Sequence, residues 1–355
     1  MKFQVINGKQ KPILSAQTCQ TLQLLKISEQ IHEISETGTG NKPLTKESIL
    51  KEFHDVFEGL GNIGDASVTV DPDAKPIQHA PRRIAVTLHQ EIKAKLAELE
   101  KKQIIVKETE PTEWISNMVV VAKPGKIRIC LDPKDLSKAI RRPKYQMPTL
   151  DETLPKLGNT KVFTTLDAKD GFYQIKLDQD SSKLSTFWTP FGRYRYLRMP
   201  FGICCAPEEF ESTLHEQLGD LEGVEVLRDD MLVVGYGDTQ DEANKNHGEN
   251  LLRLLKRARE INLKFNKKKL NLRRSEVKFM GHVLTSDGLK RDADKVKAVA
   301  EMPRPTTKQE TLSLLGFVNY LAKFLPRLSE VAQPLRELTT KNARFVWSSQ
   351  KSRSL

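Results

Sequence analysis

Val226-Leu227-Arg228-Asp229-Asp230-Met231-Leu232-Val233-Val234 contains two adjacent carboxylates within an otherwise apolar run. The apolar residues on either side predict two short strands, joined by a turn that the acids form. Asp is common in turns, so an ordinary hairpin tip is one interpretation. Two like charges side by side are costly unless a positive charge lies between them, so a bound divalent cation is the other.

The charge of the chain indicates a polyanionic partner. Its 355 residues include 57 Lys and Arg against 46 Asp and Glu, which gives a formal net charge of +11. Such a charge favours nucleic acid as the partner, with an acidic membrane surface as the second candidate. The length predicts about two or three subdomains, each with its own core.

Neither a membrane span nor a secretion signal is predicted. The longest apolar runs, such as 118–122 and 231–234, are far too short to cross a bilayer. The amino terminus lacks the apolar core of a signal peptide, so we expect an intracellular protein, cytoplasmic or nuclear, that is not secreted. The cysteines show no CxxC spacing and the histidines no ligand pattern, so we expect reduced thiols and no zinc site.

Apolar periodicity predicts a mixed α+β chain. Helices are predicted at 88–102, 149–157, 207–221, 243–263, 293–300 and 309–325, and one more from Thr45 onward. Strands are predicted at 67–70, 104–106, 117–122, 127–131, 161–167 and 277–283. The aromatic-rich stretch 185–197, with arginines interleaved, is either a packed hairpin or a surface on which bases stack, and taken alone the pattern favours packing.

A third acid joins the first two. Asp167 ends the predicted strand 161–167, and Gly171 follows with a backbone open to close approach by a ligand. If that strand lies beside the 226–234 hairpin, Asp167, Asp229 and Asp230 converge on one point. Such a cluster can hold two Mg²⁺ about 4 Å apart, an arrangement that serves phosphoryl transfer.

Four motifs, in this order, resemble those of reverse transcriptases, and more narrowly the Pol polyprotein of gypsy-type long-terminal-repeat retrotransposons. They are Thr165-Leu166-Asp167-Ala168-Lys169-Asp170-Gly171-Phe172-Tyr173-Gln174-Ile175, Met199-Pro200-Phe201-Gly202, Arg228-Asp229-Asp230 and Val277-Lys278-Phe279-Met280-Gly281-His282. The resemblance extends over nearly the whole chain from about residue 45. It implies an α+β right-hand polymerase with an antiparallel palm sheet, which transfers nucleotides from dNTPs to a primer 3′-hydroxyl on an RNA or DNA template.

The resemblance also implies a domain order. Residues 1–44 would be the remnant of a protease tail with a linker, and 45–114 the N-terminal part of the fingers. Residues 115–275 would form the fingers and palm, 276–344 the thumb or connection, and 345–355 a truncated start of a ribonuclease H region. We expect the rest of the ribonuclease H domain and the integrase to be absent. The resemblance leaves the oligomeric state open.

Individual roles follow from the same resemblance. Two Mg²⁺, or Mn²⁺ in their place, would be held by Asp167, Asp229 and Asp230 with the carbonyl of Ala168. The incoming dNTP would be bound by Lys123, Arg128, Asp170, Gly171, Phe172 and Phe201. The primer grip would be formed by Met280, Gly281 and His282, and Lys269 would be a general acid. The ring of Phe172 would leave no room for a 2′-hydroxyl, and its other interpretation is core packing.

Arg228 departs from the family pattern, which commonly has Tyr or a small apolar residue before the paired acids. A long cation there can pair with Asp229 or Asp230, compete with Mg²⁺ and obstruct the nucleotide. We therefore hypothesise that this copy is impaired or inactive. A smaller departure is Ser137, where the family often has Asn.

Two other functions compete with the polymerase. One is a catalytically inactive remnant that still binds nucleic acid. The other is a two-metal nuclease, since paired carboxylates also serve hydrolysis. The predicted triphosphate grip and aromatic gate argue against the nuclease, which has no use for them.

Overall fold

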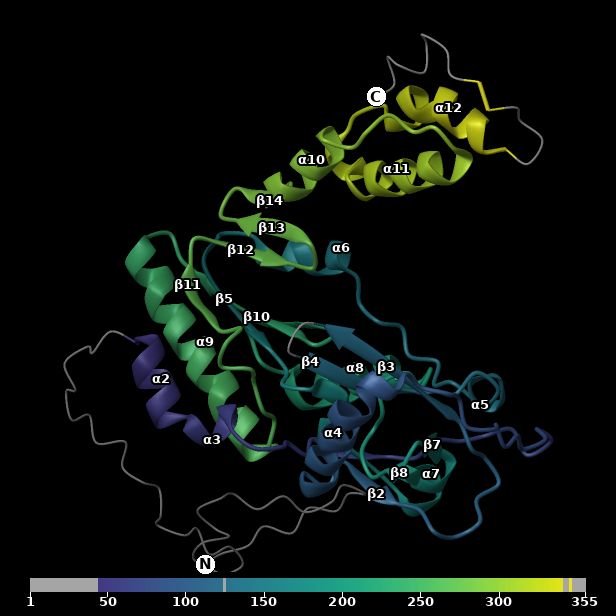
Figure 1. Ribbon diagram of the computed structural model, residues 1–355. Helices are drawn as coiled ribbons and strands as arrows, with labels where there is room; N and C mark the ends of the chain where they lie inside the picture. The colour runs from purple at the N-terminus through teal and green to yellow at the C-terminus, as the bar shows by residue number, and fades with distance from the viewer. Residues whose placement is uncertain (1–43, 124–125, 341–344, 347–355) are drawn as a thin grey trace, which may run out of the picture. The chain divides into compact units, whose positions relative to one another are not determined.

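The computed structural model describes residues 44–123, 126–340 and 345–346 (Figure 1). The predicted protease remnant therefore lies almost wholly outside the described residues, as does most of the predicted ribonuclease H start. The described α-helices are α2 (Lys46–Glu52), α3 (His54–Phe57), α4 (His89–Lys101), α5 (Leu136–Ala139), α6 (Leu150–Thr153), α7 (Gln179–Leu184), α8 (Ala206–Leu218), α9 (Gln240–Glu260), α10 (Ala293–Ala300), α11 (Lys308–Tyr320) and α12 (Leu328–Thr339). The 3₁₀-helices are η1 (Val86–Leu88), η2 (Leu154–Leu157), η3 (Gly171–Gln174) and η4 (Ala322–Phe324).

The strands form several small sheets. They are β1 (Gly64–Ala66), β2 (Ile105–Lys107), β3 (Asn117–Lys123), β4 (Lys126–Asp132), β5 (Thr160–Asp167), β6 (Ile175–Leu177), β7 (Phe187–Thr189), β8 (Gly192–Tyr196), β9 (Val224–Leu227), β10 (Asp230–Tyr236), β11 (Asn271–Arg274), β12 (Glu276–Phe279), β13 (His282–Thr285) and β14 (Gly288–Lys290). Sheet orders are β11-β5-β10-β9, β12-β13-β14, β2-β8-β7, β3-β4 and β1-β6.

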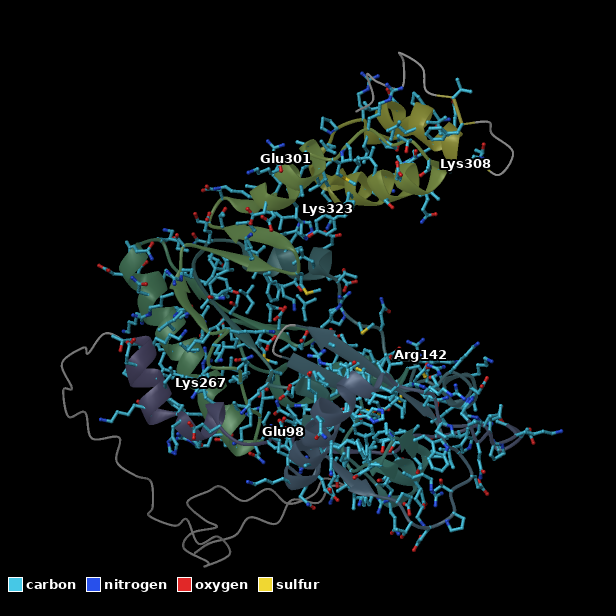
Figure 2. All side chains as sticks on the ribbon, in the orientation of Figure 1. Glu98, Arg142, Lys267, Glu301, Lys308 and Lys323 are labelled. Atoms are coloured by element: carbon cyan, nitrogen blue, oxygen red, sulfur yellow. The ribbon has the colours of Figure 1, made fainter. Side chains whose placement is uncertain are left out.

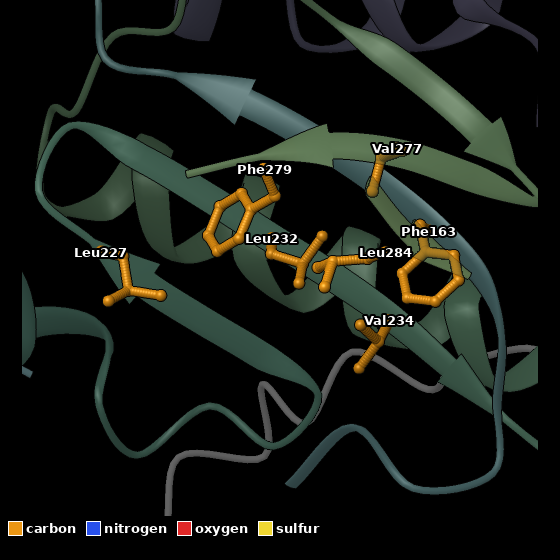
Figure 3. Close-up of a cluster of buried hydrophobic side chains, with 7 residues drawn as sticks. All are labelled: Phe163, Leu227, Leu232, Val234, Val277, Phe279 and Leu284. Carbon is orange, nitrogen blue, oxygen red and sulfur yellow. The ribbon is translucent and has the colours of Figure 1, made fainter. Parts of the chain in front are cut away.

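The four-stranded antiparallel sheet β11-β5-β10-β9 is central because both of its faces are covered. On one face, side chains of β5, β9 and β10 pack against β12 and β13 in the core cluster Phe163, Leu227, Leu232, Val234, Val277, Phe279 and Leu284 (Figure 3). On the other face lies α9, whose buried His247 forms a 2.8 Å hydrogen bond between its Nε2 and Thr164 Oγ1. Burial on both sides explains why β10 is a continuous apolar run after Asp230 rather than an alternating one.

Side-chain caps fix the starts of several helices. Thr45, Thr149 and Thr239 each form a reciprocal capping box with the residue three positions on. Before α11 the cap is Thr307, whose hydroxyl accepts the N–H of Glu310 at 3.2 Å. The helix predicted from Thr45 onward and the helix predicted at 293–300 are both confirmed, as α2 and α10.

Three predicted elements need correction. The strand predicted at 67–70 is wrong, since β1 ends at Ala66 and Val70 makes only an isolated bridge to Ile140. The run 277–283 is not one strand but the hairpin β12–β13, because Met280 and Gly281 both take positive φ and turn the chain. The helix predicted at 149–157 is α6 followed by the 3₁₀-helix η2, where Pro155 follows the first turn.

The packing interpretation of the aromatic stretch is confirmed. It forms the antiparallel hairpin β7–β8, and the rings of Phe187 and Tyr196 are 0% exposed. These two rings stack with centroids 5.0 Å apart, so neither is available to a base. Within the described ranges no helix is long and apolar enough to cross a membrane.

Candidate active site

The acidic hairpin is β9–β10, and its turn differs from the prediction. Asp230 is the first residue of β10 and pairs in register with Leu227, so the turn consists of Arg228 and Asp229. Arg228 takes a φ of 58°, a left-handed conformation that is uncommon for a residue with a side chain. The sequence placed both acids in the turn, but the positive φ at Arg228 closes the hairpin one residue earlier.

The sheet register brings the third acid to this hairpin. Asp167, the last residue of β5, lies directly opposite Asp230 of β10. One residue further on, the N–H of Ala168 donates to the carbonyl oxygen of Asp229 at 2.9 Å. Asp167 is buried, Asp230 is half-buried and Asp229 is exposed. One antiparallel strand pair and its adjoining turn thus bring the three backbone positions together.

Lys269 supplies the positive charge nearest to the acids. It lies in the loop between α9 and β11, and its Nζ forms an ion pair with Asp167 Oδ2. The same loop is fixed by the N–H of Asn266, which donates to the carbonyl oxygen of Asp167 at 2.9 Å. The guanidinium of Arg228, in contrast, makes no ion pair with the acids in the part of the chain that the structure describes.

The protonation equilibria reflect this crowding of carboxylates. Burial raises the pKa of Asp230 to about 6, and the charges of Asp229 and Asp167 add to the effect. Burial also raises the pKa of Asp167, outweighing the opposing ion pair with Lys269. Burial alone would lower the pKa of Lys269, yet the hydrogen bond to Asp167 and the nearby acids raise it. Asp167 therefore binds its proton more tightly because it is buried, and Lys269 does so because Asp167 and the neighbouring acids stabilise its charge.

A cavity of about 420 Å³ opens in front of the acids. Among its lining residues are nine predicted site residues: Arg128, Asp167, Ala168, Asp170, Gly171, Phe172, Phe201, Asp229 and Lys269. The Phe172 ring lies 5.0 Å from Phe201 and 5.7 Å from Phe210, centroid to centroid. The Arg128 guanidinium stacks 4.6 Å above the Phe201 ring, so the β3–β4 hairpin contacts the loop that carries Phe201.

The other predicted site residues are placed differently. Met280 and Gly281 form the β12–β13 turn and His282 begins β13, and none of the three lines the cavity. The Gly281 carbonyl accepts hydrogen bonds from the Tyr320 hydroxyl and, at 3.2 Å, from Lys295 Nζ. The side chain of Lys123, predicted to bind dNTP, lies outside the described residues.

The donor chemistry of this site fits a divalent cation. Carboxylate oxygens are the ligands that Mg²⁺ prefers, and Asp167, Asp229 and Asp230 bring three carboxylates to neighbouring positions where β5 pairs with β10. Among the described residues, no group of three or more Asp, Glu, His or Cys side chains is already gathered closely enough to hold an ion. In this structure the carboxylate of Asp167 pairs with Lys269.

Sequence reasoning missed several residues of the cavity. Glu211 and Phe210 come from α8, and Asn266 comes from the loop before β11. Both Phe210 and Glu211 lie in the predicted helix 207–221, where a phenylalanine is typical of the core and a glutamate of the solvent-facing side. Their spacing from the motifs carries no signal, because contact depends on how α8 packs beneath the β9–β10 hairpin.

Comparison with known proteins first identifies the class of protein to which the matched segment belongs. Residues 111–284 match the family described as reverse transcriptase (RNA-dependent DNA polymerase), and this segment of the chain belongs to that family. Solved structures of a foamy viral protease-reverse transcriptase have the same fold. The complex with dsDNA superposes with a TM-score of 0.77 at 23% identity, covering 86% of this chain and 64% of that one. The complex with an RNA/DNA hybrid has a TM-score of 0.74 and covers 42% of that chain. The predicted α+β polymerase fold is confirmed.

The curated relatives belong to a narrower group of proteins than the reverse transcriptase family as a whole. The retrovirus-related Pol polyprotein from transposon opus of Drosophila melanogaster is 32% identical over 321 residues, which is 86% of this chain and 31% of the relative. The polyprotein from transposon 297 of the same fly is 31% identical over 250 residues, or 68% of this chain and 23% of the relative. The chain thus spans less than a third of these curated relatives. It is related to retrotransposon Pol polyproteins, and the predicted gypsy type fits their names.

Proposed function

We propose that this chain is an RNA-directed DNA polymerase that adds dNTPs to a primer 3′-hydroxyl on an RNA or DNA template. The observation that carries the proposal is the strand register that sets Asp167 opposite Asp230, with Asp229 in the adjoining turn. Membership of residues 111–284 in the reverse transcriptase family and the net charge of +11 support it. The foamy viral relatives in complex with dsDNA and an RNA/DNA hybrid support nucleic acid as the partner.

In this proposal Asp167, Asp229 and Asp230, with the carbonyl of Ala168, hold two Mg²⁺, or Mn²⁺ in their place. When bound, the ions activate the primer hydroxyl and stabilise charge on the triphosphate. Lys269, which pairs with Asp167, would protonate the pyrophosphate leaving group. Lys269 is protonated at neutral pH and so has a proton to donate, and pairing with Asp167 raises its pKa and makes it a weaker acid.

The nucleotide would lie in the cavity lined by Arg128, Phe172 and Phe201. Lys123 and Arg128 of the β3–β4 hairpin would bind the triphosphate, with Asp170 and Gly171 beside it. The Phe172 ring is wedged between Phe201 and Phe210, so it cannot move aside easily and would exclude a 2′-hydroxyl. Met280, Gly281 and His282 would hold the primer end. The fingers and palm would lie at 115–275 and the thumb or connection at 276–344.

Incorporation of labelled dNTP on a homopolymer template tests the proposal. We expect synthesis with Mg²⁺ or Mn²⁺, and a loss of at least roughly 100-fold for Asp229→Asn, since a ligand carboxylate is removed. The matched control is Asp220→Asn, an exposed acid of the loop before β9 that pairs with Arg257. Synthesis that survives Asp229→Asn would contradict the assigned site.

A second candidate is a catalytically inactive protein that binds nucleic acid. It is favoured by Arg228, which lines the cavity beside Asp229. Salt-dependent binding of template and primer without incorporation would select this candidate. Arg228→Ala separates the two explanations of inactivity: restored synthesis identifies the guanidinium as the obstruction. Robust wild-type synthesis that Arg228→Ala leaves unchanged would exclude an inhibitory role for Arg228.

A further inference from the structure

Glu211 is a buried acid to which the proposed reaction gives no role. It belongs to α8, is 1% exposed, and lines the same cavity as Asp167 and Asp229. A carboxylate is rarely so deeply buried unless donors satisfy it. Its Oε1 accepts the backbone N–H of Arg228 at 3.1 Å, while its Oε2 has no hydrogen-bond partner among the described residues.

The N–H that Glu211 accepts belongs to the turn that carries the paired acids. Arg228 is the first residue of this two-residue turn and is held at a φ of 58°. The strand ladder closes the hairpin at the Leu227–Asp230 pair and leaves the two turn residues outside it. Two further contacts hold them: Glu211 accepts the N–H of Arg228, and the carbonyl of Asp229 accepts the N–H of Ala168 at 2.9 Å.

We propose that Glu211 is a positioning residue for the catalytic turn: through the Arg228 N–H it fixes the backbone that places Asp229 at the cavity and Asp230 opposite Asp167. Its consequence for catalysis rests on the proposed polymerase function, whereas the contact itself does not. Glu211 Oε1 accepts from a backbone N–H, so the positioning role of Glu211 does not depend on the side chain at position 228. Any residue except proline offers the same donor there.

Steady-state kinetics compare an apolar substitution of Glu211 with a conservative one. Glu211→Leu keeps the buried volume but removes the acceptor, and we expect kcat to fall roughly 10- to 100-fold, the range of a lost hydrogen bond to a charged group. The dNTP KM and the template-primer Kd should change by less than roughly threefold. Glu211→Gln keeps an acceptor oxygen and should restore kcat. Glu208→Gln is the matched control, because Glu208 is also buried in α8 but pairs with Arg142, a residue labelled in Figure 2.

A second comparison separates the backbone contact from charge neutralisation. If Glu211 served to offset the Arg228 guanidinium, Arg228→Ala would abolish the effect of Glu211→Leu. Our proposal expects the same loss in both backgrounds. Loss of the effect in the Arg228→Ala background would overturn it, as would a Gln variant as slow as the Leu variant.

Hydrogen exchange tests the contact without any turnover. We expect the amide of Arg228 to be protected in the wild type and in Glu211→Gln, and to exchange at least roughly tenfold faster in Glu211→Leu. Equal exchange in all three proteins would overturn the proposal. A wild type that incorporates no dNTP would refute the polymerase function, and the exchange result would still decide whether Glu211 holds the turn.

Discussion

At the scale of single residues, Gly202 shows how a backbone requirement shapes the nucleotide cavity. It follows Phe201 and takes a φ of +105°, a conformation that residues with side chains rarely adopt. A Cβ there would meet the carbonyl oxygen of Leu131 well inside van der Waals distance. The close approach allows the Leu131 N–H to donate to the Phe201 carbonyl at 2.8 Å, which ties the Phe201 loop to β4.

We therefore expect Gly202→Ala to destabilise the protein by about 1–3 kcal/mol and to raise the KM for dNTP, because the Phe201 loop must move away from β4. Urea unfolding and steady-state incorporation measure the two effects. Gly192→Ala is the control, since Gly192 has a similar φ of +114° but a Cβ added there would meet nothing within 4 Å. The backbone strain is common to both variants, so equal losses in both would show that contact with Leu131 plays no part.

At the scale of elements, the sequence predicts what depends on neighbouring residues. The Thr45 cap and the 293–300 helix are set by local signals, and both were predicted correctly. The 277–283 run was predicted as one strand because Met280 is apolar and gives no sign of its φ of 47°. The helix α12 was not predicted, since Pro334 inside it is typical of a break rather than a helix. In α12 tertiary packing overrides the local signal, whereas in 277–283 the turn has a local signal, Gly281, that the strand prediction did not use.

The same limit applies to the candidate site. Asp167, Asp229 and Asp230 could be predicted because acids that interrupt apolar strands are conspicuous in the sequence. Glu211 could not, because helices commonly carry acids on a solvent-facing side and only the packing of α8 buries this one. The cavity joins β5, α8, the β9–β10 turn and the loop before β11, and these contacts span more than a hundred residues of chain.

The contact between α9 and the central sheet should make stability depend on pH. Burial lowers the pKa of His247 to about 4, and Arg273 adds to the effect. The unfolded chain binds a proton at this residue below its ordinary pKa of about 6.5, whereas the folded chain does so only near 4. The contribution of His247 to the free energy of unfolding should therefore be constant above about pH 6.5 and fall as the pH falls toward 4, by about 3 kcal/mol in total.

Urea unfolding of the wild type and His247→Gln at pH 7, 5 and 4 measures this effect. Glutamine does not titrate, so the variant should lose less stability between pH 7 and pH 4 than the wild type does. Carboxylates elsewhere contribute equally to both proteins, and the difference isolates His247. Identical pH profiles would show that His247 is not held neutral against Thr164.

At the scale of the whole molecule, the excess of positive charge coexists with an acidic catalytic cluster. Many cations are already neutralised within the fold, such as Arg259 by Asp55 at 2.8 Å and Arg257 by Asp220 at 2.9 Å. Others remain exposed, among them Lys267 and Lys268 in the loop that also carries Lys269. Lys267, labelled in Figure 2, reaches Glu58 only at 4.0 Å. The net charge of +11 is therefore available to a polyanion at particular places rather than uniformly.

Binding of an RNA/DNA hybrid should accordingly weaken steeply with salt, because each phosphate contact releases condensed counterions. For roughly 6–10 phosphate contacts the affinity should fall about 10³- to 10⁵-fold between about 50 and 200 mM salt. Lys267→Ala combined with Lys268→Ala should make the slope of log affinity against log salt shallower by about two. Lys183→Ala should leave it unchanged, since Lys183 already pairs with Glu110 at 3.2 Å. Fluorescence anisotropy in the presence of EDTA measures binding apart from catalysis. A slope that the double substitution does not alter would mean that the loop before β11 faces away from the phosphate backbone.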